Sequence, residues 1–519
     1  MGDKYRAFIV VMVVSFGVLL IAKPVFVRWM SADDFVSRRN AWFALTAAGF
    51  LLPSLWLYML VAGVIIWFAA RRDTNPAALY LFLLLVMPPL EADLPTFGIV
   101  KSLFPINHIR LLSLVLLIPL ALRLRREGSE LGVQASSPPS AAIRAIDVLL
   151  LLFLVLQLML FVPYESITNS LRRAFLMLLT TWLPYYVMSR ACRDRRMVVE
   201  AMAALVLAAM VLAPIAAIEN VKGWLLYSGV GDSWGTDINL YSRRADVLRA
   251  SATAGHPIVL GFFFAVTLGL WLYLQRHVAR GWAWLGVAVL GTGLVAAFAR
   301  GPWVGALAII TVYVALGPNA LSRSLKGIAL LIVAGGIALA TPIGPKVLNN
   351  LPFIGNVAND TIEYRQQLLE ISLTIIGQNP FFGSPNFLLQ MEDLRQGEGI
   401  IDLVNTFAAF ALSYGLVGLA LFMGFIGVAM VQCWRSVRRF SLVDPDAAMI
   451  GVSLIACLLG VLVMLATTSN YLSIPYVYLA LAGLMRAYVR DTALPVLQDL
   501  EVKEDGSQGR FQRFSNSPS

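Results

Sequence analysis

The stretch GTGLVAAFARGPWVGALAII, residues Gly291–Ile310, is apolar almost throughout yet carries Arg300 near its centre. Placing a guanidinium in hydrocarbon costs at least about 2.5–3.5 kcal/mol. Gly301 permits a close backbone approach, and Pro302 suits the first position of a new helix. The stretch therefore predicts two membrane-spanning helices joined by a tight turn, which keeps Arg300 at the membrane surface or in an outward cavity.

Apolar runs of this kind recur along the 519 residues, of which 59% are hydrophobic and 13% are charged. Lipid admits only helices or closed barrels across its core, and these runs are too long for barrel strands. The sequence thus predicts an all-α polytopic membrane protein. The predicted spans, about fourteen in number, are 7–22, 42–70, 77–90, 106–122, 147–162, 173–189, 198–218, 256–275, 282–299, 302–317, 326–342, 403–432, 448–466 and 472–489.

Lys and Arg gather in short loops on one side of these spans, among them ARRDTN, RLRREG, SRACRDRR and RSVRRF. By the positive-inside rule this side is cytoplasmic, so the net charge of +10 does not indicate nucleic-acid binding. An even number of spans puts both termini in the cytoplasm, but the four Lys and Arg residues of loop 23–40 would then face outward. We expect residues 1–490 to form one transmembrane domain, followed by a disordered cytoplasmic tail, 491–519.

Two long loops, 219–255 and 343–402, fall on the opposite, external side. Loops of this length are uncommon unless they are functional or partly folded. The second contains TIEYRQQLLEISLTIIGQ, whose apolar residues recur at helical spacing. This pattern predicts an amphipathic helix on the membrane surface, ended by the Pro and Gly residues of NPFFGSPN.

Several arginines fall on this predicted external side, where Lys and Arg are normally scarce. Guanidinium groups from separate segments are suited to hold an anion through paired N–H donors, and a lipid-linked diphosphate is the large anion of this surface. The alternatives are a turn arginine that reaches for water and ordinary pairing with loop acids such as Asp246. The arginines concerned are Arg243, Arg244, Arg249, Arg300, Arg365 and Arg395.

Four motifs occur one after another along the sequence: RASATAGHPIVLG, AAFARGPWVGALAII, YRQQLLEISLTIIGQNPFFGSPNF and VNTFAAFALSYGLVGLALF. Over about residues 200–490 this order resembles the O-antigen ligase and polymerase-like membrane proteins. The resemblance implies an integral-membrane (GT-C-like) glycosyltransferase, acting on undecaprenyl-diphosphate-linked glycans at the periplasmic face of a bacterial inner membrane. Ligases of this family carry a His directly before the Asn of the last motif. The pair here is Val404-Asn405, which favours the repeat-unit polymerase over the ligase, the alternative within this class.

The resemblance and the arginine pattern together suggest roles for individual residues. Charge develops on the departing diphosphate, so Arg249, Arg300 and Arg365 are the predicted catalytic cations. Asp402 is the predicted general base, with Glu363 as second choice; both equally suit solvated loop acids. His256 suits either a substrate contact or a structural turn in GHP. The predicted substrate-binding residues are Arg243, Arg244, His256, Glu363, Arg395 and Asn405.

We expect no cofactor, since the sequence holds no Walker loop, Cys/His zinc spacing or nucleophile elbow. Glu91 and Asp93 form an alternative site for a divalent cation. The expected partners are the lipid-linked glycan and membrane lipid, with a chain-length regulator and export machinery as further candidates. A secondary transporter or a lipid-linked glycan flippase is the alternative from another class. The span centres are nearly free of charge, which disfavours both.

Overall fold

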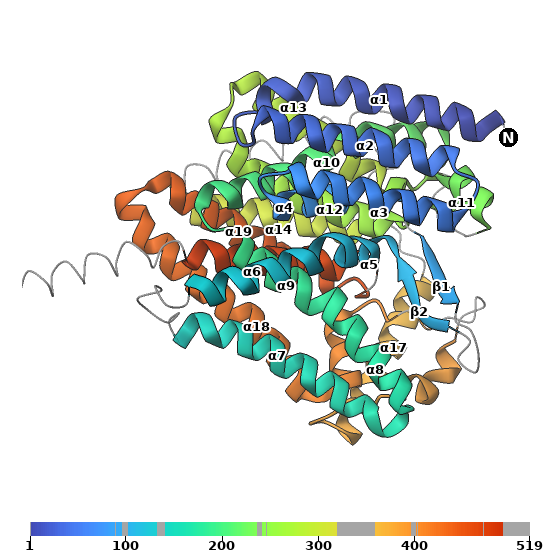
Figure 1. Cartoon of the computed structure of the whole chain (residues 1–519). Coiled ribbons are helices and arrows are strands. Elements are labelled where there is room, and N and C mark those ends of the chain that lie inside the picture. The colour runs from blue at the N-terminus through green and yellow to red at the C-terminus, as the bar shows by residue number, and fades with distance from the viewer. Residues whose placement is uncertain are drawn as a thin grey trace, which may run out of the picture.

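The computed structural model describes residues 2–88, 90–95, 102–131, 141–235, 241–244, 247–318, 359–395, 401, 403–470 and 472–490. Nearly all of this chain forms helices that run side by side (Figure 1). Within the described part, seven helices are long and apolar enough to cross a membrane. The prediction of an all-α polytopic membrane protein is therefore confirmed. The predicted span 326–342 and the tail 491–519 lie outside the described residues.

The elements of the N-terminal part are α1 (Gly2–Phe26), α2 (Ala32–Leu51), α3 (Leu55–Arg72), α4 (Pro76–Leu83), β1 (Glu91–Pro95), β2 (Ser102–Asn107), α5 (His108–Leu112), the π-helical η1 (Ser113–Leu117), α6 (Ile118–Leu131), α7 (Ala141–Phe161), η2 (Val162–Tyr164), α8 (Ile167–Met177), the π-helical η3 (Leu178–Trp182), α9 (Leu183–Ala191) and α10 (Arg195–Lys222). The later elements are α11 (Ser228–Trp234), β3 (Arg243–Arg244), β4 (Val247–Leu248), η4 (Ala252–Ala254), α12 (Pro257–Leu274), η5 (Gln275–His277), α13 (Arg280–Ala296), α14 (Arg300–Leu316), α17 (Asn359–Gln378), η6 (Phe387–Leu394), α18 (Thr406–Val443), α19 (Pro445–Leu465) and a last helix over 474–490.

The predicted single span 42–70 is wrong, because the structure has two helices there, α2 and α3. Pro53 follows the end of α2, and a proline cannot donate a backbone hydrogen bond and disfavours a helical conformation in the residue before it. Leu52 is accordingly extended, with φ −79° and ψ 134°. Because the structure has one more helix near the start of the chain than predicted, α1 runs in the direction opposite to the predicted one.

The N-terminus consequently lies at the opposite end of the bundle from the end of helix 474–490. Lys4 Nζ donates to Ser233 Oγ of α11 at 2.8 Å, whereas Arg490 Nη2 donates to the Cys192 carbonyl at 2.6 Å. The prediction that the N-terminus lies on the same face as the end of the last span is thus wrong, while the tail 491–519 lies outside the described residues. Arg28 of loop 23–40 donates to the His277 carbonyl at 3.1 Å, so this loop lies with the other arginine-rich loops and its conflict disappears.

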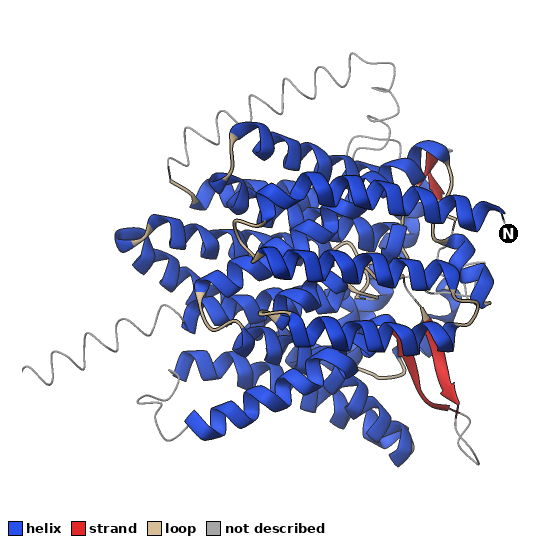
Figure 2. Ribbon diagram, turned by 45° about the horizontal axis from the view of Figure 1, so that its top comes forward, coloured by secondary structure: helices blue, strands red, loops and turns tan. Residues whose placement is uncertain are grey.

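We call these two ends the Arg-rich face and the α11 face. The Arg-rich face holds the links α1–α2, α9–α10, α12–α13 and α18–α19, joined by contacts such as Arg195 Nη1 to Asp444 Oδ2 at 2.6 Å. The α11 face holds the N-terminus, and both two-stranded hairpins, β1–β2 and β3–β4, lie at this same end (Figure 2).

Helices α10, α12 and α19 form the centre of the bundle. Their apolar windows are 83%, 89% and 83% buried within the protein, against 28% for α1 and 17% for α7. The outer helices therefore present apolar side chains to lipid. Small residues bring the central helices close together, as membrane interfaces require. A Cβ on Gly269 of α12 would come within 2.5 Å of Ile309 of α14.

Helix α18 is broken at Gly415, which adopts φ 68° and ψ −175°. The segment after α17 docks on this break: Leu416 N donates to the Pro380 carbonyl at 2.7 Å, and Ser384 N donates to the Leu412 carbonyl at 2.7 Å. Gly383, at φ 67°, would place a Cβ 2.5 Å from the Leu412 oxygen. The motif NPFFGSPN ends the predicted helix as expected, and it also fixes the kink of α18.

Candidate active site

The turn between α13 and α14 places Arg300 at the α11 face. Phe298 in this turn has φ 48°, and Arg300 opens α14 with Pro302 two residues later. The Arg300 side chain is half-buried, and its Nε has no hydrogen-bond partner among the described residues. A buried N–H donor without an acceptor is costly, which leaves the guanidinium suited to receive an anion.

A segment that we call the strap, residues 241–244 with 247–256, is hydrogen-bonded to this turn. Ala250 N donates to the Ala296 carbonyl at 3.1 Å, and Arg244 Nη1 donates to the Phe298 carbonyl at 3.5 Å. Asn220 Nδ2 bridges both segments, reaching the Leu248 carbonyl at 2.6 Å and that of Ala296 at 3.2 Å. The structure thereby brings Arg244 and Arg300 into one neighbourhood.

Arg249 is buried in the strap, with 7% of its surface exposed. Its Nη1 donates to Ser242 Oγ at 3.2 Å, and its backbone N donates to the Ser242 carbonyl at 2.9 Å. A guanidinium this deeply enclosed is less hydrated and screened than one in open solvent, so it attracts an anion more strongly.

His256 caps the N-terminus of α12, and its Nδ1 accepts a hydrogen bond from Ile258 N at 3.1 Å. Burial, together with the nearby charge of Arg249, lowers the pKa of His256 to about 4. The imidazole is therefore neutral at neutral pH. Because Nδ1 is the acceptor, Nε2 carries the proton and can donate a hydrogen bond.

Glu219 is hydrogen-bonded to the strap and is absent from the residues predicted for the site. It is fully buried near the end of α10, where its Oε2 accepts from Ser251 N at 3.1 Å and from Ala252 N at 2.9 Å. These bonds hold Ala252 in a left-handed conformation, φ 42°. In the sequence, Glu219 stands where an apolar span ends and a long loop begins. A carboxylate at such a position is the one sequence signal that could indicate its role in positioning the strap.

Asn405 approaches the same turn from the other side. Its Oδ1 caps α18 by accepting from Phe407 N at 3.0 Å and Ala408 N at 3.2 Å. Thr406 Oγ1 donates to the Thr468 carbonyl at 2.6 Å. A Cβ on Gly301 would lie 2.7 Å from Thr467 Oγ1. The start of α18, the 467–470 turn and the Arg300 turn are therefore contiguous.

The described contacts do not bring the side chains of the remaining predicted residues to this neighbourhood. Arg243 is exposed and pairs through its backbone with Leu248. Arg395 is exposed and holds Glu392 through two hydrogen bonds of 2.8 and 2.6 Å. The side chains of Arg365 and Glu363, on α17, and the whole of Asp402 lie outside the described residues.

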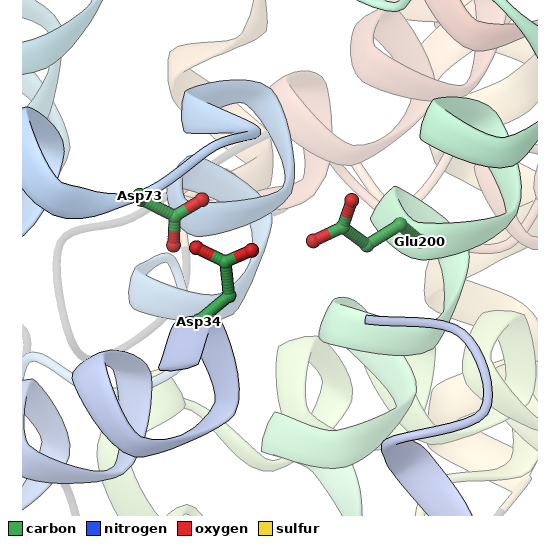
Figure 3. Close-up of side chains that lie close together, drawn as sticks. All are labelled: Asp34, Asp73 and Glu200. Atoms are coloured by element: carbon green, nitrogen blue, oxygen red, sulfur yellow. The ribbon is translucent and has the colours of Figure 1, made fainter. Parts of the chain in front are cut away.

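A separate group of carboxylates converges at the Arg-rich face: Asp34, Asp73 and Glu200 (Figure 3). The guanidinium of Arg38 already lies among them, 2.8 Å from Asp73 through Nε and 2.6 Å from Glu200 Oε1 through Nη2. The spacing alone resembles a metal site, but Arg38 supplies the cation. This buried network ties α2 to α10 and to the link after α3.

The predicted acidic pair at the α11 face is also partly engaged. Glu91 Oε1 lies 3.4 Å from Arg110 Nη1 and is largely exposed. Asp93 shares the strand, two residues along, where it pairs with Pro105. The described contacts therefore offer Glu91 a protein cation, and they give no separate support to a divalent ion there.

Residues 285–423 match a family model described as O-Antigen ligase. The match runs from within α13 to the first half of α18, so it includes Arg300 and Asn405 but not the strap. No curated protein matches the chain. The family match supports an O-antigen ligase or polymerase-type function on a lipid-linked glycan, in a multi-pass membrane protein.

Proposed function

We propose that this protein joins lipid-linked oligosaccharide repeat units into a longer glycan, because residues 285–423 match a family model described as O-Antigen ligase. The donor in this proposal is linked to undecaprenyl diphosphate. We assign the Arg-rich face to the cytoplasm by the positive-inside rule, and hence the α11 face to the periplasm of a bacterial inner membrane. The observation that carries the proposal is the half-buried Arg300, with a free Nε donor among the described residues, beside the strap that holds Arg249.

The reaction transfers a glycan between two oxygen atoms. A hydroxyl of the acceptor sugar attacks the anomeric carbon of the sugar on the lipid diphosphate. A new C–O bond forms while the bond from that carbon to the diphosphate oxygen breaks. The lipid diphosphate leaves with the electron pair, and the hydroxyl proton passes to a base. Negative charge on the leaving oxygen therefore grows in the transition state.

Fixed guanidinium groups stabilise such charge most effectively when they are held in place before the reaction. In our proposal Arg300 and Arg249 contact the diphosphate, and Arg244 reaches it from the strap. The two oxygens of Glu219 are already engaged by backbone N–H groups, so this carboxylate positions the strap and does not neutralise the arginines. Arg365 remains a proposed third catalytic cation.

We assign the proton to Asp402, which lies three residues before Asn405 in the sequence, with Glu363 as second choice. His256 is neutral at neutral pH, so it serves as an Nε2–H donor to a sugar hydroxyl or a phosphate oxygen. The amide of Asn405 keeps its Nδ2 donors available among the described residues, since its Oδ1 alone caps α18.

Transfer to a different acceptor, the ligase reaction, is the second candidate, and the description of the matching family favours it. The pair Val404-Asn405 favours polymerisation, since family ligases carry His before that Asn. Deleting the protein from its native strain separates the two. Loss of a polymerase leaves single lipid-linked units and no long polymer, whereas loss of a ligase leaves long polymer on its lipid. Units held on the inner leaflet would indicate a flippase and refute both.

A further inference from the structure

A cavity of about 190 Å³ lies between α7, η3, the N-terminal part of α18 and the helix 474–490. We propose that this cavity binds one uncharged sugar ring of the glycan acceptor, next to the arginine site. The identity of that ring as the acceptor rests on the proposed function, whereas the binding of a neutral sugar does not. The cavity is smaller than the pockets of about 300–1,000 Å³ that hold drug-sized ligands, which suits a single ring.

The lining has the chemistry of a carbohydrate site. It includes the amides of Gln157 and Asn470 and the hydroxyls of Thr180 and Thr181, with aromatic rings such as Tyr414 among them. Amides and hydroxyls both donate and accept, as sugar hydroxyls require, while aromatic rings give apolar area for the faces of a sugar ring. Among the described residues, the lining contains no Lys, Arg, His, Asp or Glu, so these residues offer no counter-charge to a phosphate.

Several of these polar groups have hydrogen-bonding capacity that the described residues leave unused. In the described part of the chain, the side chains of Gln157 and Thr181 make no hydrogen bond to protein atoms. Asn470 accepts from Tyr478 Oη at 3.3 Å, which leaves its Nδ2 donors unused. These three side chains are half-buried, and polar side chains within an apolar helical bundle are rare and often functional. A ligand that carries several hydroxyls would satisfy them together.

The backbone around the cavity is irregular at two points that orient its lining. Thr180 and Thr181 lie in the π-helical turn η3, a feature found frequently at functional sites. Tyr414 directly precedes the kink at Gly415, whose geometry is fixed by the Pro380–Gly383 segment. Both irregularities thus lie at residues that line the cavity.

The cavity is joined to the arginine site by the short turn 467–470. Thr467 lies against Gly301, directly after Arg300, and Asn470 lines the cavity three residues later. A sugar ring held by Asn470 would thus be a neighbour of a diphosphate held by Arg300. This arrangement suits an acceptor hydroxyl that must reach the anomeric carbon of the donor.

The test uses the full chain in lipid nanodiscs and saturation-transfer NMR with five methyl glycosides: glucoside, galactoside, mannoside, rhamnoside and N-acetylglucosaminide. At least one should give a signal with the wild-type protein. The double variant Gln157→Leu/Thr181→Val should bind it about tenfold or more weakly, because two hydrogen bonds are lost. The control Thr292→Val changes a threonine on α13 outside the cavity and should bind as the wild type does.

Equal binding by all three proteins, or no binding of any glycoside, would overturn the cavity proposal. The outcome is distinguishable from a failure of the proposed function. If polymer synthesis in cells survives Arg300→Ala while Gln157-dependent sugar binding persists, the cavity proposal stands and the polymerase proposal fails. If polymer is lost with Arg300→Ala but no variant alters sugar binding, the cavity assignment is the part that is wrong.

Discussion

Gly415→Ala tests how the kink of α18 builds the site. Gly415 adopts φ 68° and ψ −175°, a region that is open essentially to glycine alone and costs another residue about 1–3 kcal/mol. An added Cβ would also overlap the carbonyl of Phe381, so the docked segment 380–384 must shift. We therefore expect a loss of at least about 2–3 kcal/mol of unfolding free energy, together with weaker sugar binding near Tyr414.

The matched control lies in the same helix. A Cβ added to Gly427 of α18 would meet no atom within 4 Å, so Gly427→Ala only replaces a flexible residue with a better helix former. It should leave stability unchanged or raise it by up to about 1 kcal/mol. The assay is thermal unfolding of both purified variants against wild type. Equal melting of Gly415→Ala and Gly427→Ala would refute the account of the kink.

Two further predictions concern the buried titratable side chains Arg38 and His256. Arg38→Met leaves Asp73 and Glu200 without their cation, so we expect it to lower the free energy of unfolding by about 3–5 kcal/mol. The control Arg39→Met removes an exposed contact to Asn40 and should lower it by less than about 1 kcal/mol. Denaturant unfolding of both purified variants measures the difference. The folded pKa of His256, about 4, lies below its ordinary 6.5, so the unfolded chain binds more protons in that window and stability falls as pH drops through it. Wild type should lose more melting temperature between pH 7 and pH 4.5 than His256→Asn, which keeps a capping side chain but does not titrate; parallel losses would contradict this.

The sequence was sufficient for the architecture because lipid allows few solutions. Apolar runs predicted most helices, and the Arg-Gly-Pro order predicted the turn between α13 and α14. The predicted span 42–70 contains Pro53, and α2 ends just before this residue. This one additional helix inverts the expected placement of the N-terminus. Once the break is recognised, the basic loop 23–40 agrees with the positive-inside rule.

The candidate site was harder to predict, because its residues meet through backbone contacts. Nothing in the sequence shows that Ala250 bonds to Ala296, which is what sets the strap beside Arg300. Arg395 has the same residue type and predicted side as Arg300, yet it pairs with Glu392 three residues earlier. The contacts of Glu219 cannot be predicted from the sequence, because its partners are backbone N–H groups and these carry no sequence signature.

Polymer synthesis in the native strain, with its own protein replaced by Arg300→Ala or Arg395→Ala, tests the central claim most directly. Each change removes one arginine from the same predicted side. Of the two, Arg300 has a buried Nε donor with no partner among the described residues, whereas Arg395 is paired with Glu392. With both variants present at wild-type levels in the membrane, Arg300→Ala should abolish long glycan and accumulate single lipid-linked units, while Arg395→Ala keeps near-normal chain length. Normal polymer in the Arg300→Ala strain would contradict a role for this guanidinium in glycan joining.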